Sequence, residues 1–480
     1  MLDIGQDLPN PRISTVSLRI SSVLDRIYGP KQGSKRLVSR CVRGRIEVFP
    51  MQLRANSHAM TRFSSISTAI AWWVSLLLAG QATAQHQWTE FRGPTGQGHA
   101  AASADPPVTW SEQQNIVWKT PIHGSGWSSP VVWNDQVWVT TATEDGKDNF
   151  AVCVDRKDGR IVHDLRLFHN EKPEDTRSYN SFASPTPAIE EGRIYVHYGS
   201  YGTACLDTAD GHVIWERRDL PCNHWRGPGS SPILFEDLVF IHFDGHDYQY
   251  IVALDKATGA SVWKKDREIE YLSTDGDYRK AYATPQVIEA NGRLQLISPC
   301  ANGALAYDPR TGEVLWKVQW ENHSVAARPL FDGNLLYLST GFSKGDLWAV
   351  RPDGAGDVTA SHVVWKRSKN VGSQPSPLLV DGLIYLVHDA GVASCVDAAT
   401  GDEVWIKRWE GTFSSSPIFA GGRIYFSNKE GETTVLAPGK KYTELAKNKL
   451  DAGSMASPAA LEKSLFLRTN THLYRIDAPQ

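Results

Sequence analysis

The sequence contains few cysteines, which bind zinc, and few methionines, which adapt to irregular cores. Its 480 residues include only six cysteines and four methionines, and no two cysteines are adjacent or arranged as Cys-x-x-Cys. This spacing gives no indication of a zinc site. The short signatures of zinc proteases, P-loop enzymes and protein kinases are also absent. With so little methionine, the 17 tryptophans and the other aromatic residues must fill much of the interior.

The chain also lacks an excess of positive charge outside its N-terminal region. Residues 1–84 carry 11 Lys and Arg against 4 Asp and Glu, whereas residues 85–480 carry 39 against 49. A domain with this acidic balance is a poor candidate for general nucleic-acid binding, which depends on neutralising phosphates. We therefore expect no nucleic-acid partner.

No apolar run is long enough to span a bilayer, but a shorter run occupies residues 70–79. Met60-Thr-Arg62 precedes it, and Ala82-Thr-Ala84 follows it as a small-x-small cleavage site. This order is typical of a signal peptide over residues 60–84. The alternative, a buried helix, is disfavoured because polar sequence follows immediately. We expect a periplasmic or secreted protein with no transmembrane segment after cleavage.

The 59 residues before this segment are basic and show no sustained periodicity. Translation from Met60 or Met51 would make residues 1–59 an artefact of start-site choice, and otherwise they form a disordered arm. Residues 85–114 form a lead-in to the rest of the chain. The residue directly after the expected cleavage site is Gln85 and not a cysteine, which disfavours a lipid anchor there.

From residue 115 to residue 480 the chain repeats one unit. Each unit reads Ser/Ala-Ser/Thr-Pro, an apolar strand, a glycine turn, a strand rich in Tyr and Val, a strand ending in Asp, a second turn, and a strand carrying Trp. The units recur every 40 to 55 residues, the range of four-stranded propeller blades. The anchor prolines are Pro130, Pro185, Pro232, Pro285, Pro329, Pro377, Pro417 and Pro458.

The second turn of the unit is nearly invariant. Its aspartate can accept hydrogen bonds from the turn's own backbone, and its glycine takes the positive φ that closes the turn. The tryptophan of the following strand can pack its flat ring against the neighbouring blade. The turns occupy residues 155–159, 207–211, 255–259, 308–312 and 397–401, and the tryptophans are Trp215, Trp263, Trp316, Trp365 and Trp405.

The last unit lacks one strand, and the N-terminal region supplies it. Three strands follow Pro458, while Asn115-Ile-Val-Trp118-Lys matches Val213-Ile-Trp215-Glu of the repeat. An N-terminal strand that joins the C-terminal blade closes the ring and removes two exposed sheet edges. The sequence therefore predicts an all-β fold, an eight-bladed β-propeller of four-stranded antiparallel blades. Seven blades remain an alternative if the unit after Pro417, which lacks both the turn and the Trp, is not a full blade.

Three cysteines occupy one position of the repeat. Cys153, Cys205 and Cys395 stand two residues before the turn aspartate, where other units have alanine. A position that alternates between Cys and Ala is a small buried core site rather than a ligand set. Cys222 and Cys300 lie in less regular segments, and the sequence leaves them either free or bridged.

Variation among the units concentrates in the loops of one face. The connections between blades and the loops between second and third strands emerge there, and the connections entering the second to fifth units place cations beside aromatic side chains. On an acidic protein this pattern favours a pocket for an anionic or polar ligand. The alternative is solvated loops with structural salt bridges. The candidate ligand-binding residues are Arg177, Tyr179, His224, Trp225, Arg226, Asp244, His246, Arg279, Lys280, Tyr282, His323 and Arg328.

His242-x-Asp244-x-His246 has the composition of a metal site. Two histidines and an aspartate within five residues of a turn are more often hydrogen-bonding turn residues. We therefore expect no metal there, and we assign no catalytic residue.

The repeat, as in Ala253-Leu-Asp255-Lys-Ala-Thr-Gly259-Ala-Ser-Val-Trp263, resembles the repeat of enzymes that depend on pyrroloquinoline quinone (PQQ). The resemblance covers roughly residues 115–480. The segment Trp88-Thr-Glu-Phe-Arg-Gly-Pro-Thr-Gly-Gln-Gly98 is similar to the opening of secreted PQQ-like propeller proteins of planctomycete-type bacteria. A more distant similarity is to the propeller lipoprotein that helps to assemble outer-membrane β-barrels, whose loops and edges bind proteins.

The resemblance to quinoprotein alcohol dehydrogenases implies PQQ with calcium, an adjacent Cys-Cys disulfide, a tryptophan floor and an aspartate base. This chain has no Cys-Cys pair, no recognisable Glu/Asn/Asp calcium set and no long insertions between its units. The repeat therefore indicates the fold more than a reaction. We expect an exported, monomeric binding or interaction module for a protein, a glycan or a small anionic ligand. The alternatives are a redox enzyme using PQQ and calcium, and a scaffold for envelope protein assembly.

Overall fold

The computed structural model describes residues 87–176 and 179–478. The expected signal peptide at residues 60–84, the upstream stretch 1–59 and the candidate Arg177 lie outside the described residues. Within the described part of the chain, no helix is both long enough and apolar enough to cross a bilayer.

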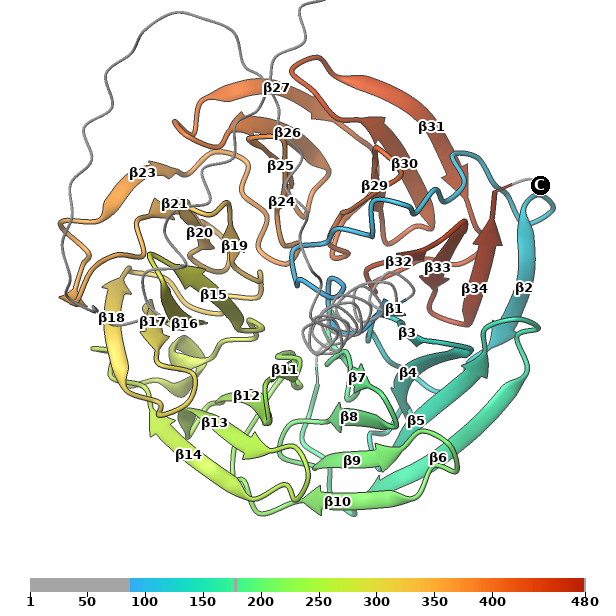
Figure 1. Ribbon diagram of the computed structural model, residues 1–480, viewed down its shortest axis with the longest axis horizontal. Helices are drawn as coiled ribbons and strands as arrows, with labels where there is room; N and C mark the ends of the chain where they lie inside the picture. The colour runs from blue at the N-terminus through green and yellow to red at the C-terminus, as the bar shows by residue number, and fades with distance from the viewer. Residues whose placement is uncertain (1–86, 177–178, 479–480) are drawn as a thin grey trace, which may run out of the picture. The chain divides into compact units, whose positions relative to one another are not determined.

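Eight sheets follow one another around a ring (Figure 1). In each sheet four antiparallel strands lie side by side, in order from the centre of the ring to its rim. The first four blades are β3 (Val131–Trp133), β4 (Gln136–Ala142), β5 (Asp148–Asp155) and β6 (Ile161–His169); β7 (Ala188–Glu190), β8 (Arg193–His197), β9 (Thr203–Asp207) and β10 (Val213–Arg217); β11 (Ile233–Phe235), β12 (Leu238–Asp244), β13 (Gln249–Asp255) and β14 (Ser261–Asp266); and β15 (Gln286–Ala290), β16 (Arg293–Cys300), β17 (Gly303–Tyr307) and β18 (Val314–Gln319).

The other four blades complete the ring. They are β19 (Leu330–Phe331), β20 (Leu336–Ser339), β21 (Leu347–Val350) and β23 (Val363–Arg367); β24 (Leu378–Val380), β25 (Leu383–Val387), β26 (Val392–Asp397) and β27 (Glu403–Arg408); β28 (Ile418–Ala420), β29 (Arg423–Ser427), β30 (Glu432–Ala437) and β31 (Thr443–Lys449); and β32 (Ala459–Leu461), β33 (Ser464–Arg468), β34 (His472–Asp477) and β2 (Ile116–Pro121). Two short strands extend the sheets: β1 (Gln87–Trp88) pairs with β3, and β22 (Gly356–Asp357) pairs in parallel with β18.

The prediction of eight blades is confirmed, and the alternative of seven is wrong. The divergent unit after Pro417 forms the complete four-stranded sheet β28–β31. The predicted closure is confirmed too, because β2 pairs antiparallel with β34 and places Trp118 opposite Arg475. The ring thus has no unpaired edge where its first and last blades meet.

Five repeated tryptophans donate a hydrogen bond to the next blade, namely Trp118, Trp215, Trp263, Trp365 and Trp405, whereas Trp316 donates to Gln295 of its own blade. Trp215 of β10 donates its indole hydrogen to the carbonyl of Lys256 in the following blade, with an N···O distance of 2.9 Å. The same ring covers Gly259, where a Cβ atom would lie 2.6 Å from the ring and where φ is +71°. The turn therefore requires glycine for two reasons, its left-handed backbone and the indole face above it. Trp118–Gly159, Trp263–Gly312 and Trp365–Gly401 repeat this contact.

A second repeated contact ties the inner strands together around the centre of the ring. In most blades the residue before the innermost proline is Ser or Thr, and its hydroxyl accepts a hydrogen bond from the equivalent backbone N–H of the preceding blade at 2.9 or 3.0 Å. This hydroxyl ring consists of Ser129, Thr186, Ser231, Thr284, Ser376, Ser416 and Ser457, with Arg328 at the remaining position.

The position of the hydroxyl ring shows that one of the predicted anchor prolines, Pro185, is wrong. Thr186 precedes Pro187, and β7 begins at Ala188, so Pro187 rather than Pro185 is equivalent to the other anchor prolines. The unit contains two prolines one residue apart, and the sequence pattern alone fits either of them.

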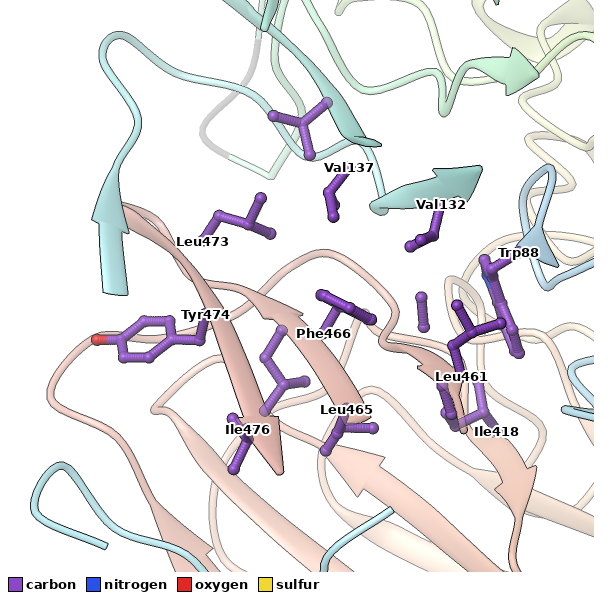
Figure 2. Close-up of a cluster of buried hydrophobic side chains, with 14 of the residues drawn as sticks. Trp88, Val132, Val137, Ile418, Leu461, Leu465, Phe466, Leu473, Tyr474 and Ile476 are labelled. Carbon is purple, nitrogen blue, oxygen red and sulfur yellow. The ribbon is translucent and has the colours of Figure 1, made fainter. Parts of the chain in front are cut away.

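The lead-in binds across the centre of the propeller. Trp88 is completely buried beside Val132, Leu461 and Ile418, where the first blade meets the last two (Figure 2). The buried guanidinium of Arg92 donates to the carbonyl of Pro377 at 2.7 Å, on the inner side of another blade. The lead-in therefore contacts both ends of the blade sequence and reinforces the closed ring.

The cysteine position of the repeat is a core position. Cys153, Cys205 and Cys395 are completely buried, as are the alanines that replace them. Each faces a bulky residue across the sheet, as in the pairing of Cys205 with Trp215. All five described cysteines are free thiols, which settles the open cases of Cys222 and Cys300.

Candidate functional site

Loops from five connections between blades and one hairpin converge on a cavity of about 330 Å³ on the variable face. We call it the Arg226 cavity; it is lined by Tyr179, Asn180, Arg226, Asp277, Tyr278, Tyr282, His323, Ser324, Ala326, Phe342, Ser373 and Gln374. It adjoins a central cavity of about 140 Å³, which shares Tyr179, Tyr282, Ala326 and Gln374 and is lined by Phe91 and by every residue of the hydroxyl ring except Ser376. The lead-in thus contributes to the floor of the central cavity.

Arg226 is the main charged group of this cavity. Its Nη2 donates to Oδ2 of Asp277 at 2.6 Å, and its Nη1 donates to the hydroxyl of Tyr179 at 3.1 Å. The guanidinium lies 4.6 Å from the ring centre of Trp225, in a cation–π contact. The side chains of Arg226 and Asp277 are each about one quarter exposed. The pair therefore stands partly open to a ligand.

The backbone of Arg226 is held in an unfavourable conformation. Its φ is +88°, in the left-handed region that non-glycine residues rarely adopt. The N–H donates to the Asp175 carbonyl at 3.0 Å, and the carbonyl accepts from Nδ2 of Asn180 at 2.8 Å. Strained residues that neighbouring groups hold in place cluster at binding and active sites. The side chain of Arg226 is thus preorganised by the connection that enters the preceding blade.

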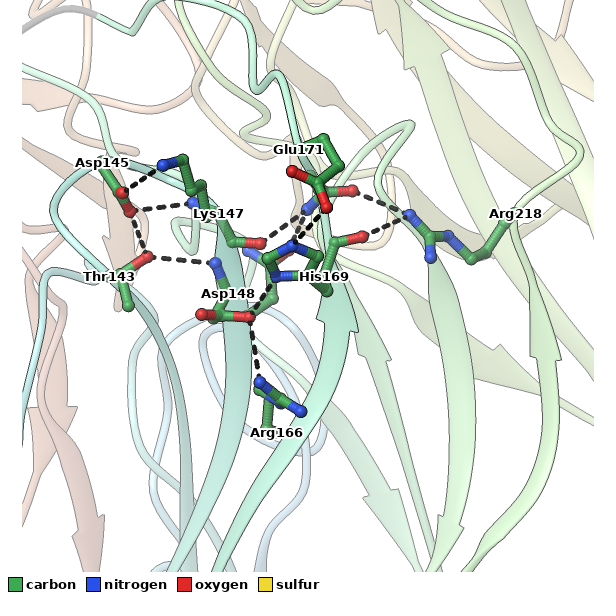
Figure 3. Close-up of polar contacts among 10 residues, drawn as sticks. Thr143, Asp145, Lys147, Asp148, Arg166, His169, Glu171 and Arg218 are labelled. Atoms are coloured by element: carbon green, nitrogen blue, oxygen red, sulfur yellow. Dashed lines mark hydrogen bonds and ion pairs between the residues drawn. The ribbon is translucent and has the colours of Figure 1, made fainter.

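A network on the outer edge fixes where that connection starts (Figure 3). His169, the last residue of β6, contacts Asp148 at 2.7 Å and Glu171 at 3.3 Å. The hydrogen bond to Asp148 raises the pKa of His169. Arg218, from the next connection, donates to the carbonyl of His169 at 3.1 Å and so links the two connections.

Aromatic rings form the opposite wall of the cavity. Tyr278 belongs to the short 3₁₀ helix η3 (Gly276–Arg279), whose preceding residue Asp275 accepts a hydrogen bond from the Asp277 N–H at 3.0 Å. The ring of Tyr278 meets that of His323 edge to face, with centroids 4.7 Å apart. Burial lowers the pKa of His323, which therefore presents a neutral imidazole at neutral pH.

Lys280 and His224 lie beneath the cavity and support it. The Nζ of Lys280 donates to the carbonyls of His224 and Trp225, at 2.8 Å for the former. Burial lowers the pKa of Lys280 to about 8 and holds the pKa of His224 well below its usual range. Through these bonds Lys280 fixes the connection that carries Arg226.

Two of the candidate residues take part in buried ion pairs instead. Asp244 accepts from Nε and Nη2 of Arg267 at 2.8 and 2.7 Å, and neither side chain is more than 1% exposed. Arg328 is buried and donates to Glu90 of the lead-in at 2.7 Å. Both pairs are inside the propeller and away from the Arg226 cavity, so the structure gives them a role in holding segments together.

The remaining candidates, Arg279 and His246, do not line the cavity. Arg279 donates from Nε to the Ser273 carbonyl at 2.8 Å and so folds its own loop. His246 is exposed, and its ring meets that of Trp225 edge to face at 5.6 Å. Of the described candidates, the structure brings Tyr179, Arg226, Tyr282 and His323 to the cavity.

The three residues of His242-x-Asp244-x-His246 do not converge on one point. His242 is buried, and its Nε2 lies 2.8 Å from the Ser298 hydroxyl. Asp244 is taken by Arg267, whereas the Nε2 of His246 lies 3.9 Å from Asp275. His242 Nδ1 lies 3.8 Å from Asp244 Oδ2, but His246 faces Asp275 instead, so the three side chains share no ligand position.

Several residues that line the cavity are not among the candidates predicted from the sequence. Phe342 comes from the hairpin between β20 and β21, and Ser373 and Gln374 come from the connection that enters the sixth blade. The signal was present, because Ser373-Gln-Pro-Ser376-Pro has the same alternating prolines as Ser184-Pro-Thr186-Pro before β7. The connection that contains Ser373 and Gln374 is short, whereas the sequence prediction relied on the long polar connections that enter the second to fifth units.

The side chains that line the cavity do not fit PQQ with a bound calcium ion. Calcium takes about six to eight oxygen ligands, several of them carboxylates. Asp277 is the one carboxylate among the described lining residues, and it is neutralised by Arg226. Arg226 is likewise the one permanent cation of the lining, although PQQ is a polycarboxylate. No cysteine of the described chain lines the cavity to provide the disulfide of those dehydrogenases.

Comparison with known proteins places the chain among quinoprotein-type propellers. The family model described as outer membrane protein assembly factor BamB, PQQ_2, matches residues 80–266 and 302–440. The 1-butanol dehydrogenase (quinone) of Thauera butanivorans is 25% identical over 286 residues, which cover 52% of this chain and 40% of that protein. The chain thus spans well under half the length of this curated relative.

Solved structures share the fold at low sequence identity. A europium-containing methanol dehydrogenase matches with a TM-score of 0.61 and 11% identity, covering 82% of this chain and 98% of that one. The quinohemoprotein alcohol dehydrogenase of Comamonas testosteroni has the same TM-score and identity, covering 84% of this chain and 83% of its own. Similarity at this level demonstrates the propeller alone. Because the family model matches more than half of its residues, the chain belongs to the PQQ_2 family described as outer membrane protein assembly factor BamB, as a PQQ-like propeller related to that protein and to quinoprotein dehydrogenases.

Proposed function

We propose that this protein is an exported binding module that holds a polar ligand in the Arg226 cavity. The observation that carries the proposal is the preorganised Arg226, held at φ +88° between Tyr179 and Asp277. A side chain fixed in this way offers donors to a ligand without a further loss of conformational entropy. The volume of about 330 Å³ lies at the lower end of the range for small-molecule sites, about 300–1,000 Å³.

Export is supported by the signal-peptide pattern of residues 60–84 and by the family. BamB, which gives the family its description, is an outer membrane protein assembly factor. We therefore propose a periplasmic or secreted location for the propeller. The acidic balance of residues 85–480 favours partners other than nucleic acid.

The enzyme alternative rests on the relation to quinone-dependent dehydrogenases. The donor set described above argues against PQQ with calcium in this cavity. His323 Nδ1 lies 3.0 Å from the Ser324 hydroxyl. Among the described lining residues, this is the one pair that resembles a general base beside a nucleophile. In a hydrolase a carboxylate orients the imidazole through its other nitrogen. Among the described residues no hydrogen bond joins His323 Nε2 to a carboxylate, so binding is favoured.

The proposal is tested by thermal unfolding in the presence of a panel of small polar compounds. The panel contains neutral sugars, amino acids, dicarboxylates, and PQQ with Ca²⁺. A compound at a hundredfold excess over its dissociation constant stabilises the native state by about 2.7 kcal/mol. We expect at least one saturable shift that is lost in Arg226→Ala.

The matched control is Arg310→Ala, which removes an exposed ion pair with Glu236 on another surface. It should leave the shift intact. The proposal is wrong if no compound shifts unfolding, or if the shift survives in Arg226→Ala. A shift with PQQ and Ca²⁺, accompanied by substrate-dependent dye reduction, would favour the enzyme instead.

A further inference from the structure

A second and larger pocket lies directly outside the Arg226 cavity. It has a volume of about 720 Å³ and sits between the fourth and fifth blades. Tyr278, His323 and Phe342 line both pockets and form a ridge between them. We call the two pockets and this ridge the groove.

The ridge presents aromatic surface to solvent. Tyr278 is 50% exposed and Phe342 is 47% exposed, although large apolar side chains are usually covered. Further along, Trp320 and Trp348 form the base of the outer pocket, with ring centroids 5.7 Å apart. A ligand lying along the groove would therefore pass over one aromatic ring after another.

The groove contains aromatic and polar side chains but almost no aliphatic ones. Its lining includes no Leu, Ile, Val or Met, and alanine occurs once, at Ala326. Pockets that take the apolar side chains of a peptide need aliphatic walls as well as aromatic ones. Flat aromatic faces beside hydroxyl, amide and carboxylate groups instead fit sugar rings, which present C–H faces and a rim of hydroxyls.

The charges of the groove cancel. The lining has three cations, Arg226, Lys344 and Lys366, and three carboxylates, Asp277, Glu321 and Asp346. The strongest contacts are internal, such as Arg226 with Asp277 at 2.6 Å and Lys366 over the Trp348 ring at 3.6 Å. A neutral ligand costs less to desolvate against such a surface than an anion would.

Two buried donors of the groove have no acceptor within the described chain. They are Nε of Arg226 and the indole nitrogen of Trp320, and Trp320 is 6% exposed. Buried donors without a partner are rare and call for a ligand or another explanation. Arg226 lines one pocket and Trp320 lines the other, so a ligand that contacted both residues would have to cross the ridge.

We infer that the groove binds a linear, uncharged oligosaccharide, with one part in the Arg226 cavity and the rest in the outer pocket. This inference rests on the proposed binding function and names the ligand class of that same site. It predicts that affinity grows with chain length, because short sugars fill only one pocket.

The test is calorimetric titration of the full-length protein with neutral linear oligosaccharides of two to six sugars, in the cello-, malto- and chito- series. We expect at least one series in which the longest member binds about tenfold tighter than the disaccharide, or more. In Phe342→Ala the longer oligosaccharides should lose more affinity than the disaccharide, because only a chain that crosses the ridge contacts this ring from both pockets. Tyr248→Ala is the matched control, because that side chain is 49% exposed but lines neither pocket, and it should change nothing.

The outcomes separate this inference from the proposed function. Binding that does not depend on chain length would overturn the two-pocket ligand and leave the binding module standing. Binding only of oligogalacturonate, or only of peptides from a casein digest, would overturn the neutral oligosaccharide. No binding of any series would do so as well, while the small-molecule panel decides the proposed function by itself. If Phe342→Ala unfolds, Tyr278→Ala tests the same ridge.

Discussion

Asp244 and Arg267 form a two-pronged ion pair that is sealed inside the third blade, with N···O distances of 2.8 and 2.7 Å. Arg226 and Asp277 form a pair with a single hydrogen bond, and this pair stands partly open in the cavity. The first pair joins the end of β12 to the residue after β14, whereas the second joins two loops at the site. The same residue types therefore form a sealed pair in one place and, in the proposed function, a pair that is open to a ligand in the other.

Replacing Asp244 by Asn should strongly destabilise the protein. The change leaves the buried Arg267 without a counter-charge, and breaking such a pair costs about 3–5 kcal/mol. Urea unfolding measures the loss. The control is Glu236→Gln in the exposed pair with Arg310, for which about 0–1 kcal/mol is expected. Equal losses in both variants would show that the sealed pair is not important for stability.

Replacing Gly259 by Ala should destabilise more than replacing Gly292 by Ala. Both glycines have φ close to +70°, so both variants carry the left-handed strain of about 1–2 kcal/mol. A Cβ at Gly259 would also lie 2.6 Å from the Trp215 ring, whereas nothing lies within 4 Å at Gly292. Overpacking of this kind adds about 1–3 kcal/mol. Identical unfolding free energies for the two variants would refute the role of the indole.

Lys280 should make stability depend on alkaline pH. Burial lowers its pKa from 10.5 to about 8, so the folded state releases this proton at lower pH than the unfolded state. Below pH 8 both states are protonated and the full cost of burying the charge applies. Between pH 8 and 10.5 the unfolded state binds more protons, so the free energy of unfolding should rise by up to about 3 kcal/mol from this group.

Urea unfolding of the wild type and Lys280→Met at several pH values between 7 and 10 measures this contribution. The stability of the wild type relative to the variant should increase across the interval. A difference that stays constant with pH would mean that Lys280 is not a buried, titrating amine.

The five described thiols should be unreactive in the folded protein. Burial raises the pKa of Cys205, Cys300 and Cys395 to about 12, and the thiolate is the reactive form. In a Cys41→Ser variant, Ellman's reagent should label nothing quickly under native conditions and five thiols in guanidinium. Rapid labelling of one native thiol would contradict the burial of that position.

Much of the fold could be predicted because short stretches of sequence identify each repeat unit. The turn glycines, the tryptophans and the alternation of Cys with Ala each depend on neighbours within one or two blades. The strand around Trp118 could be recognised as the missing fourth strand for the same reason. Where the local pattern was ambiguous, as at Pro185 and Pro187, the prediction chose the wrong residue.

The candidate site was only partly predictable. The variable loops indicated the face on which the Arg226 cavity lies, but sequence pattern could not separate Arg226, which lines the cavity, from Arg328, which is buried against Glu90. Both are arginines in polar connections before a blade. Burial depends on what the lead-in covers, and that contact joins residues 238 positions apart.

The repeat unit, the order of the blades and the strand that closes the ring follow from the sequence, because hydrophobic period, turn chemistry and tryptophan spacing act over short distances. The choice between eight and seven blades needed the structure, in which the divergent unit after Pro417 forms a complete sheet. Only the tertiary structure decided which side chains meet. Arg226 and Asp277 are 51 residues apart and come from different connections, yet the ring brings them to 2.6 Å. The site is therefore a consequence of ring closure, which places loops from five successive connections around one centre.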